Sequence, residues 1–406
     1  MTPVGGQLRT QNGSSSRDLH KLLLVLPSLG GGGAERASID LLRGIRRDRF
    51  EPSLALFAHS GPFLKQVPAD VRVHDLHGQN QYDARLVWRL SLLLRHEKPD
   101  IILSVLRYAN LITLLARPLS GAGARVVVNE QNLPSAEFAA FGGAAVKGWA
   151  LKELYPRADL VTAISHGIAR ELTSLYGLPE EKVEVICNPV DVARVLALAE
   201  EPTRHAWLQS GPGASDAPVL MAAGRLHRQK GFPHLIRAFA AVRRVRPCKL
   251  VILGEGPDRS RLEKLVVGLG LCDDVALPGF DENPYSAMRH ATAFVLSSLY
   301  EGFGNVLVEA LAVGTPVVST RCPVGPDEII TDGVTGLLVP PADDEALAQS
   351  ILRILDDSEL RRKLSANGPA RAADFGLERS VAQYESAFER LLDRPQPMQT
   401  VTRGRQ

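Results

Sequence analysis

Short apolar runs rich in Leu, Val and Ile alternate with longer amphipathic segments along almost the whole chain. This alternation is typical of βαβ units, which assemble into parallel sheets. Helices are expected in most of the intervening segments, as at residues 85–95 and 345–355. The pattern predicts strands near 22–26, 53–57, 71–76, 101–104, 126–129, 160–164, 183–187, 219–223, 250–253, 275–277, 293–296, 316–319 and 336–339.

A chain of 406 residues is longer than one hydrophobic core usually serves. Asn188-Pro189 ends one regular stretch, and residues 209–216 are loop-like. We therefore predict an α/β protein with two Rossmann-like domains, whose parallel sheets face a cleft and bind ligands outside the carboxyl ends of their strands. The predicted parts are a disordered segment at 1–17, a domain at 18–190, a linker at 191–217, a second domain at 218–375, a helix at 376–393 and a disordered tail at 394–406.

The composition of the chain excludes several classes of function. Lys and Arg number 47 against 45 Asp and Glu, which excludes the strong basic excess of a nucleic-acid wrapper. The four cysteines lie too far apart for a metal knuckle or a redox pair. The apolar run at 22–26 is too short for a signal core or a membrane span, so we expect a cytoplasmic protein with four reduced thiols.

Three glycine-containing loops follow predicted strands. Gly30–Arg36 precedes a helical pattern, where free amide groups can bind an anion, although a flexible turn explains it equally well. Gly224–Gly231 carries three cations, and arginine and lysine there can grip phosphate oxygens. The third loop, Gly254–Pro257, is either a tight turn beside a ligand or a plain turn.

A fourth junction, Tyr300–Leu311, places Glu301 after a strand and Glu309 on the helix that follows. Eight residues of helix would separate the two carboxylates by about 12 Å. The acid and nucleophile of a glycosidase are about 5–9.5 Å apart, so this pair does not fit a hydrolase. The two glutamates can instead reach two parts of one elongated ligand.

Together these segments resemble the signature of retaining glycosyltransferases of family 4, whose Glu, seven residues, Glu pattern is met by Glu301 and Glu309. The likeness runs in the family's order from about residue 22 to 340 and implies the GT-B fold, with the last helix, near 378–392, crossing back onto the first domain. The other matching segments are Gly32–Arg36, Ile186–Asp191, Gly224–Gly231, Gly254–Pro257, Gly279–Tyr285 and Cys322–Ile330.

The resemblance also implies a role for each matching residue. Arg225 and Lys230 would hold the diphosphate of a nucleotide sugar, and Glu309 would bind the ribose hydroxyl groups. Glu301 would lie beside the sugar ring. The remaining donor-site candidates are Gly32, Gly33, Gly254, Phe303, Gly304, Asn305 and Val306. No Asp-x-Asp triplet occurs, which fits a site without a metal or other cofactor.

The chain departs from the pattern of family 4 at one place in the first domain, where many members of the family carry a histidine near the sugar. Residues 126–132 contain none, so Asn129, Glu130 or Asn132 is a candidate for its place, or the role is absent. His166 lies at another strand end, where it is either a cleft residue or an ordinary residue beside the Ser165 cap.

The resemblance further implies a UDP-sugar carrying a hexose or N-acetylhexosamine, and a lipid-linked or saccharide acceptor. Peripheral membrane contact follows from such an acceptor, and Arg43, Arg46, Arg47 and Arg49 beside Leu41, Leu42 and Ile45 form either a membrane-binding face or a solvated one. Two alternatives stay open. They are a sugar-nucleotide epimerase of the same fold and a sugar-nucleotide-binding protein without catalytic activity.

Overall fold

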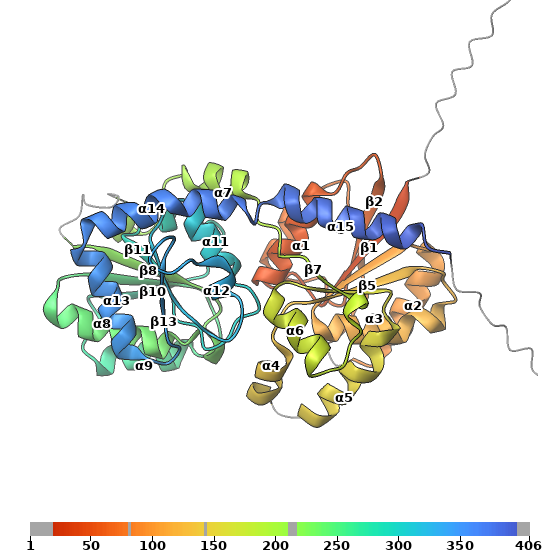
Figure 1. The fold of residues 1–406 in the computed structure, drawn as a ribbon, viewed down its shortest axis with the longest axis horizontal. Helices are drawn as coiled ribbons and strands as arrows, with labels where there is room; N and C mark the ends of the chain where they lie inside the picture. The colour runs from red at the N-terminus through yellow and green to blue at the C-terminus, as the bar shows by residue number, and fades with distance from the viewer. Residues whose placement is uncertain (1–18, 80–82, 142–143, 210–216, 396–406) are drawn as a thin grey trace, which may run out of the picture.

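The computed structural model describes residues 19–79, 83–141, 144–209 and 217–395, which form two α/β domains joined along one edge (Figure 1). The segment at 1–17 and the tail beyond residue 395, both predicted to be disordered, lie outside the described residues, as does nearly all of the loop at 209–216.

The first domain contains a seven-stranded parallel sheet in the order β3-β2-β1-β4-β5-β6-β7. Its strands are β1 (His20–Leu26), β2 (Phe50–Leu56), β3 (Arg72–Asp75), β4 (Ile101–Val105), β5 (Arg125–Glu130), β6 (Leu160–Ala163) and β7 (Val183–Val185). Its helices are α1 (Gly33–Gly44), η1 (Pro62–Gln66), α2 (Arg85–Glu97), α3 (Arg107–Ser120), α4 (Pro134–Phe141), α5 (Ala144–Leu154), η2 (Tyr155–Arg157), α6 (His166–Ser174) and η3 (Glu180–Lys182).

The second domain repeats this topology with a six-stranded parallel sheet in the order β10-β9-β8-β11-β12-β13. Its strands are β8 (Val219–Ala223), β9 (Lys249–Leu253), β10 (Val275–Gly279), β11 (Ala293–Leu296), β12 (Val317–Thr320) and β13 (Leu337–Val339). Its helices are η5 (Arg228–Lys230), α8 (Phe232–Val245), α9 (Arg259–Gly268), α10 (Pro284–His290), α11 (Asn305–Ala312), α12 (Pro326–Ile329), α13 (Asp344–Asp356) and α14 (Ser358–Ala373).

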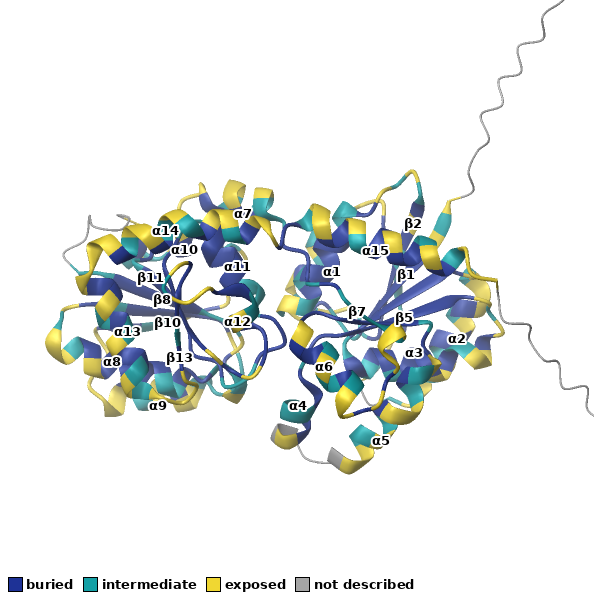
Figure 2. Ribbon diagram, in the orientation of Figure 1, coloured by how far each residue is buried: buried dark blue, intermediate teal, exposed yellow. Residues whose placement is uncertain are grey.

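The inner strands form the buried centre of each domain, and most helices keep one exposed face (Figure 2). Helix α11 has no exposed residue, because it lies between the second sheet and the first domain. The predicted α/β class with two Rossmann-like parallel sheets is confirmed, and a strand forms at every predicted position. The largest difference is at β2, which begins three residues earlier than its apolar pattern because Phe50 pairs with His20 of β1. Sheet pairing thus extends the strand beyond its apolar core.

The segment between the two sheets is not free of structure. Within the predicted linker, residues Val192–Ala199 form helix α7 and Ala206–Leu208 form the short helix η4. Helix α7 packs on α10 and α11, so it belongs with the second domain.

Helix α15 (Leu377–Leu392) follows α14 along the second domain and then lies on the first, where it packs against α1 (Figure 1). This crossing bears on the arginines at 43–49, in and just after α1, which were expected to form either a membrane-binding or a solvated face, and it disfavours the first. Arg46 Nε donates to Glu385 Oε2 at 2.7 Å, and Arg49 pairs with Glu389, both carboxylates being on α15. Leu41, Leu42 and Ile45 are buried, and the remaining arginines, Arg43 and Arg47, pair with Asp40 and Asp70.

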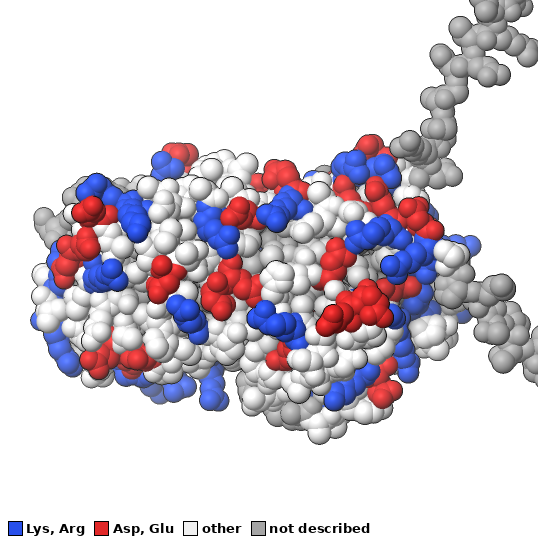
Figure 3. All heavy atoms as spheres, in the orientation of Figure 1, with Lys and Arg blue, Asp and Glu red and all other residues white. Residues whose placement is uncertain are grey.

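Acidic and basic side chains are interspersed over both domains on the face shown in Figure 3. Such mixing gives no extended field of one sign, in agreement with the near balance of 47 basic and 45 acidic residues. Among the described residues, no helix has the length and apolar content that crossing a membrane would require.

Candidate functional site

Two loops at the carboxyl ends of β8 and β11 are bound to one another and bring Lys230 to Glu301. Lys230 Nζ donates to Glu301 Oε1 at 2.5 Å, and Ser298 Oγ donates to the same oxygen at 2.6 Å. Ser297 Oγ also donates to the carbonyl oxygen of Lys230. Glu301 is buried. The ammonium group of Lys230 and the hydroxyl group of Ser298 hold its carboxylate in one orientation.

The loop after β9 packs backbone against backbone on the loop after β8. Gly254 has φ +136°, and a Cβ atom there would lie 2.0 Å from the carbonyl oxygen of Gly224. Only glycine permits that approach. The aliphatic part of Lys230 covers Gly224. Three of the predicted donor-site segments therefore meet at this edge of the second sheet.

Helix α11 begins beside these loops. In the part of the chain that the structure describes, the amide groups of Phe303, Gly304 and Asn305 donate no hydrogen bond. Asn305 Nδ2 donates to the carbonyl oxygen of Gly33 at 3.0 Å, and its Oδ1 accepts from Asn188 Nδ2 at 3.2 Å. The helix start thus contacts the first domain while its amide groups stay available to an anion. The Phe303 side chain is buried against Phe375, so only its backbone is available to a ligand, whereas Val306 is half-buried.

Glu309, further along α11, is buried and contacts residues of both domains. Its Oε1 accepts from Tyr285 Oη at 3.4 Å and lies 3.9 Å from Arg36 Nε. Arg36 Nη1 donates to the same tyrosine oxygen at 2.5 Å. Burial raises the pKa of Glu309, and the Arg36 charge and the Tyr285 hydrogen bond partly offset the rise.

Arg225 is exposed on the loop after β8. It faces the segment Gly30–Arg36 of the first domain, which we call the glycine loop. Burial raises the pKa of Glu35, and the positive charge of Arg225 partly offsets that rise. The Glu35 carboxylate also lies over Gly32, where a Cβ atom would be 2.6 Å from its Oε2. The glycine loop therefore faces Arg225 of the second domain, and Gly33 lies beside Asn305 of α11.

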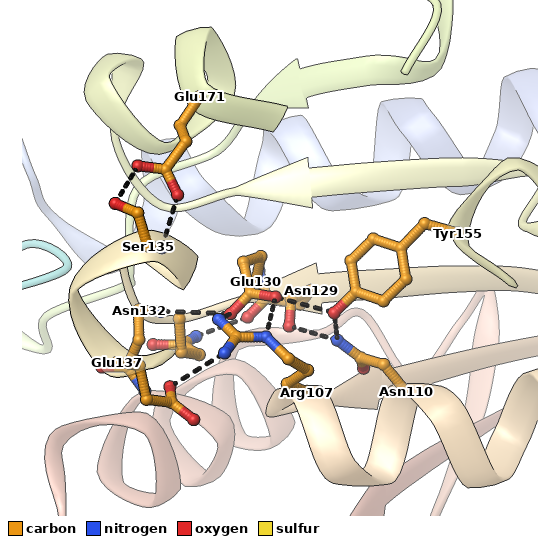
Figure 4. A network of polar contacts seen from close by, with 10 residues as sticks. Arg107, Asn110, Asn129, Glu130, Asn132, Ser135, Glu137, Tyr155 and Glu171 are labelled. Atoms are coloured by element: carbon orange, nitrogen blue, oxygen red, sulfur yellow. Dashed lines mark hydrogen bonds and ion pairs between the residues drawn. The ribbon is translucent and has the colours of Figure 1, made fainter. Parts of the chain in front are cut away.

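Of the predicted acceptor-side residues, Asn129 and Glu130 are fully buried. Figure 4 shows both within a network of polar contacts. Glu130 accepts from Arg107 Nη2 at 2.8 Å, from Arg107 Nε at 3.1 Å and from Tyr155 Oη at 2.7 Å. Asn129 Nδ2 donates to Tyr384 Oη on α15. Since both side chains are closed to solvent and hydrogen-bonded, the structure does not bring either of them to the cleft.

Asn132 and His166 are the predicted acceptor-side residues that keep some exposure. His166 begins helix α6, and its amide group donates to Glu328 Oε2 at 2.8 Å, while Gly167 donates to Oε1 at 2.9 Å. Glu328 belongs to α12 of the second domain, so this contact joins the two domains. The His166 side chain is exposed beside that contact.

Arg36 and Glu328 were missed as functional residues, although both lie in the segments that carried the resemblance. Their charges are visible in the sequence, next to glycine-containing turns. Their partners, Glu309 and the amide groups of α6, come from the other domain, and no periodic pattern predicts that pairing.

Comparison with known families covers most of both domains. The model described as "Glycosyltransferase Family 4" matches residues 31–194, and that described as "Glycosyl transferases group 1" matches residues 204–371. A transferase from Campylobacter jejuni is 31% identical over 88% of this chain and 96% of its own length. The chain belongs to glycosyltransferase family 4.

That Campylobacter relative is named as an N-acetylgalactosamine-N,N'-diacetylbacillosaminyl-diphospho-undecaprenol 4-alpha-N-acetylgalactosaminyltransferase. The lipopolysaccharide core biosynthesis glycosyltransferase LpsE of Rhizobium meliloti is 29% identical over 83% of this glycosyltransferase and 89% of the relative. One of these relatives is thus named for an undecaprenol-linked acceptor, and the other for the biosynthesis of the lipopolysaccharide core.

Solved structures support the fold. Anabaena Alr3699/HepE in complex with UDP-glucose has a TM-score of 0.75 at 23% identity, covering 90% of this glycosyltransferase and 99% of that chain. Sucrose-phosphate synthase from Thermosynechococcus elongatus has a TM-score of 0.76 at 21% identity, covering 92% and 99%. The predicted GT-B fold is therefore confirmed.

Proposed function

We propose that this glycosyltransferase moves a hexose or N-acetylhexosamine from a UDP-sugar to a hydroxyl group of a lipid-linked or saccharide acceptor. The reaction would retain the anomeric configuration and serve polysaccharide or glycolipid biosynthesis. The observation that carries the proposal is the meeting of Lys230, Glu301 and the start of α11 at one sheet edge, with Arg225 on the same loop as Lys230. The names of the Campylobacter and Anabaena proteins support the choice of acceptor and nucleotide.

In this proposal Arg225 and Lys230 bind the diphosphate. As the sugar–phosphate bond breaks, negative charge builds up on the leaving diphosphate. Fixed cations and helix-start amide groups stabilise that charge more in the transition state than in the bound substrate. Lys230 is already oriented by Glu301, which limits the reorganisation needed during the reaction.

The remaining donor-site roles in this proposal are those that the resemblance to family 4 implies for the residues around this centre. Glu301 lies beside the sugar ring, and Glu309 accepts hydrogen bonds from the ribose hydroxyl groups. The unpaired amide groups of Phe303, Gly304 and Asn305 face the sugar phosphate, and Gly32 and Gly33 line the first domain's side. Asn132 or His166 is proposed to meet the acceptor.

No metal enters this proposal, because the basic side chains and helix-start amide groups supply the positive charge that the diphosphate requires. Across the described ranges, no group of three or more His, Cys, Asp or Glu side chains has an arrangement that holds a metal ion.

A surface on the first domain supports contact with the cytoplasmic face of a membrane. Helix α3 packs on both α2 and α5, and all three helices expose large apolar side chains, with Trp88 61% and Trp149 63% exposed. Tryptophan is favoured at the boundary between lipid and water, and α5 also carries Lys147 and Lys152. The apolar members of this surface are Trp88, Leu92, Leu115, Leu119, Val146 and Trp149.

A donor screen tests the function. The purified chain is incubated with UDP-, GDP- and ADP-sugars and a membrane-lipid extract, and nucleoside diphosphate release and a new glycolipid are measured. We expect release from a UDP-sugar only when the extract is present. Conversion of the sugar nucleotide without an acceptor would identify an epimerase instead. Binding of sugar nucleotide with no release under any condition would identify a protein without catalytic activity.

A further inference from the structure

Arg36, in the first turn of α1, contacts two residues of the other domain. Its Nη1 donates to Tyr285 Oη on α10, and Tyr285 Oη donates in turn to Glu309 Oε1 on α11. The three side chains form a chain of hydrogen bonds from the first domain to a carboxylate of the second. Consecutive hydrogen bonds polarise one another and hold their members more firmly than isolated bonds do.

The guanidinium group of Arg36 is itself held in place. It lies 4.7 Å from the ring centroid of Phe63 in η1 and 5.3 Å from that of Tyr285. Its side chain is only 17% exposed. Contact with both aromatic rings restricts the guanidinium group and the direction of its donors.

The contacts of Glu309 divide between its two oxygens. Tyr285 and Arg36 both approach Oε1, whereas Oε2 makes no hydrogen bond in the described part of the molecule. Oε2 also does not belong to the buried side-chain atoms that lack a partner, so it keeps access to solvent. One oxygen is therefore anchored, and the other is left to accept hydrogen bonds from a ligand.

We propose that Arg36 is a positioning residue for nucleoside recognition, which acts through Tyr285 to orient the Glu309 oxygen that binds the ribose hydroxyl groups. This inference rests on the proposed function, in which Glu309 binds the ribose. Because Arg36 and Glu309 belong to different domains, ribose recognition is strengthened when the two domains are in contact.

The inference is tested by comparing the affinities of UDP and 2′,3′-dideoxy-UDP for the full chain by calorimetry. We expect the wild type to prefer UDP by about tenfold or more, as for hydrogen bonds to a charged group. Arg36→Met should reduce this preference to near unity and leave the affinity for the dideoxy compound unchanged. Arg36→Lys, which keeps the charge without the planar group, should retain part of the preference.

Matched variants separate the outcomes. Arg289→Met removes an exposed arginine of α10 that pairs with Glu200, and it should behave as the wild type. The role of Arg36 is overturned if Arg36→Met lowers the affinities for UDP and 2′,3′-dideoxy-UDP equally. It is also overturned if the variant keeps the preference of the wild type for UDP. If Arg36→Met fails to fold, a full wild-type preference in both Arg36→Lys and Tyr285→Phe overturns it.

Glu309→Gln distinguishes a failure of this inference from a failure of the proposed function. If Glu309→Gln abolishes the preference while Arg36→Met preserves it, only the role of Arg36 is wrong. If Glu309→Gln preserves the preference, or the wild type shows none or binds no UDP, the proposed ribose site is wrong and the role of Arg36 falls with it.

Discussion

Lys230 Nζ lies 2.5 Å from Glu301 Oε1, although 71 residues separate the two along the chain. The pairing follows from the strand order, because β8 and β11 are neighbours in the sheet and their carboxyl ends share one edge. In the proposed function, a cation held by a buried carboxylate at this edge needs little reorganisation to bind a diphosphate.

Replacement of Lys230 tests that arrangement. We expect Lys230→Ala to lower kcat by about 100-fold or more, because it removes a fixed charge from the leaving diphosphate. Steady-state kinetics with a saturating donor measure the effect, and Lys264→Ala, at an exposed position of α9, is the control. A rate close to that of the wild type would refute the assignment.

Arg225 is expected to contribute by its shape as well as its charge. Arg225→Ala should lower kcat by about 100-fold, and Arg225→Lys should restore only part of the rate, because lysine lacks the planar fork that binds two phosphate oxygens. The measurement is kcat and donor KM for both variants, with Arg261→Ala on α9 as the control. Full activity of Arg225→Ala would remove this residue from the diphosphate site.

Much of the fold could be predicted because apolar runs of strand length are buried on both faces in a parallel sheet. The strand pattern placed Lys230 and Glu301 each after a strand, and the resemblance to family 4 placed both at the donor site. It failed for Glu130, which also ends a strand. Arg107 of α3 and Tyr155 of η2 cover that carboxylate, and a strand pattern does not reveal what packs over its end.

The arginines in and just after α1 show a second limit. Their pattern indicated either a membrane-binding or a solvated face, but Arg46 pairs with Glu385, which lies 339 residues further along the chain. Contacts of such separation depend on the path of α15 across the two domains, which local pattern does not encode. The Arg36–Glu309 contact was missed because it depends on how the two domains meet, which local pattern does not encode either.

Activity in the presence of EDTA tests the absence of a metal from the proposed reaction. We expect an unchanged rate, because Arg225, Lys230 and the amide groups at the start of α11 supply the positive charge that a divalent ion would otherwise provide. Nucleoside diphosphate release is measured with EDTA and again after excess Mg²⁺ or Mn²⁺. A rate lost in EDTA and restored by either ion would contradict the expectation.

The exposed apolar surface of α2, α3 and α5 predicts binding to anionic lipid. Trp88→Ser combined with Trp149→Ser should reduce sedimentation with phosphatidylglycerol vesicles, because it removes two exposed aromatic anchors. Activity on a water-soluble acceptor should be unchanged. Val245→Ser with Val267→Ser alters equally exposed side chains of the second domain and is the control. Equal vesicle binding by the wild type and both double variants would exclude this surface.

Gly302 tests whether close contact between the domains is needed for turnover. A Cβ atom at this position would lie 2.0 Å from the carbonyl oxygen of Gln131 in the first domain, so Gly302→Ala must push the two domains apart. The shift would carry Glu301 and α11 away from the glycine loop, and a displacement of about 1 Å can cost 100-fold in rate. We expect that loss in kcat/KM, while the variant keeps a cooperative thermal transition.

Gly268→Ala, where a Cβ atom meets nothing within 4 Å, should leave the rate unchanged. If Gly302→Ala turned over as fast as this control, the contact between Gly302 and Gln131 would have no part in catalysis, and the active arrangement of the domains would have to be more open than the one described.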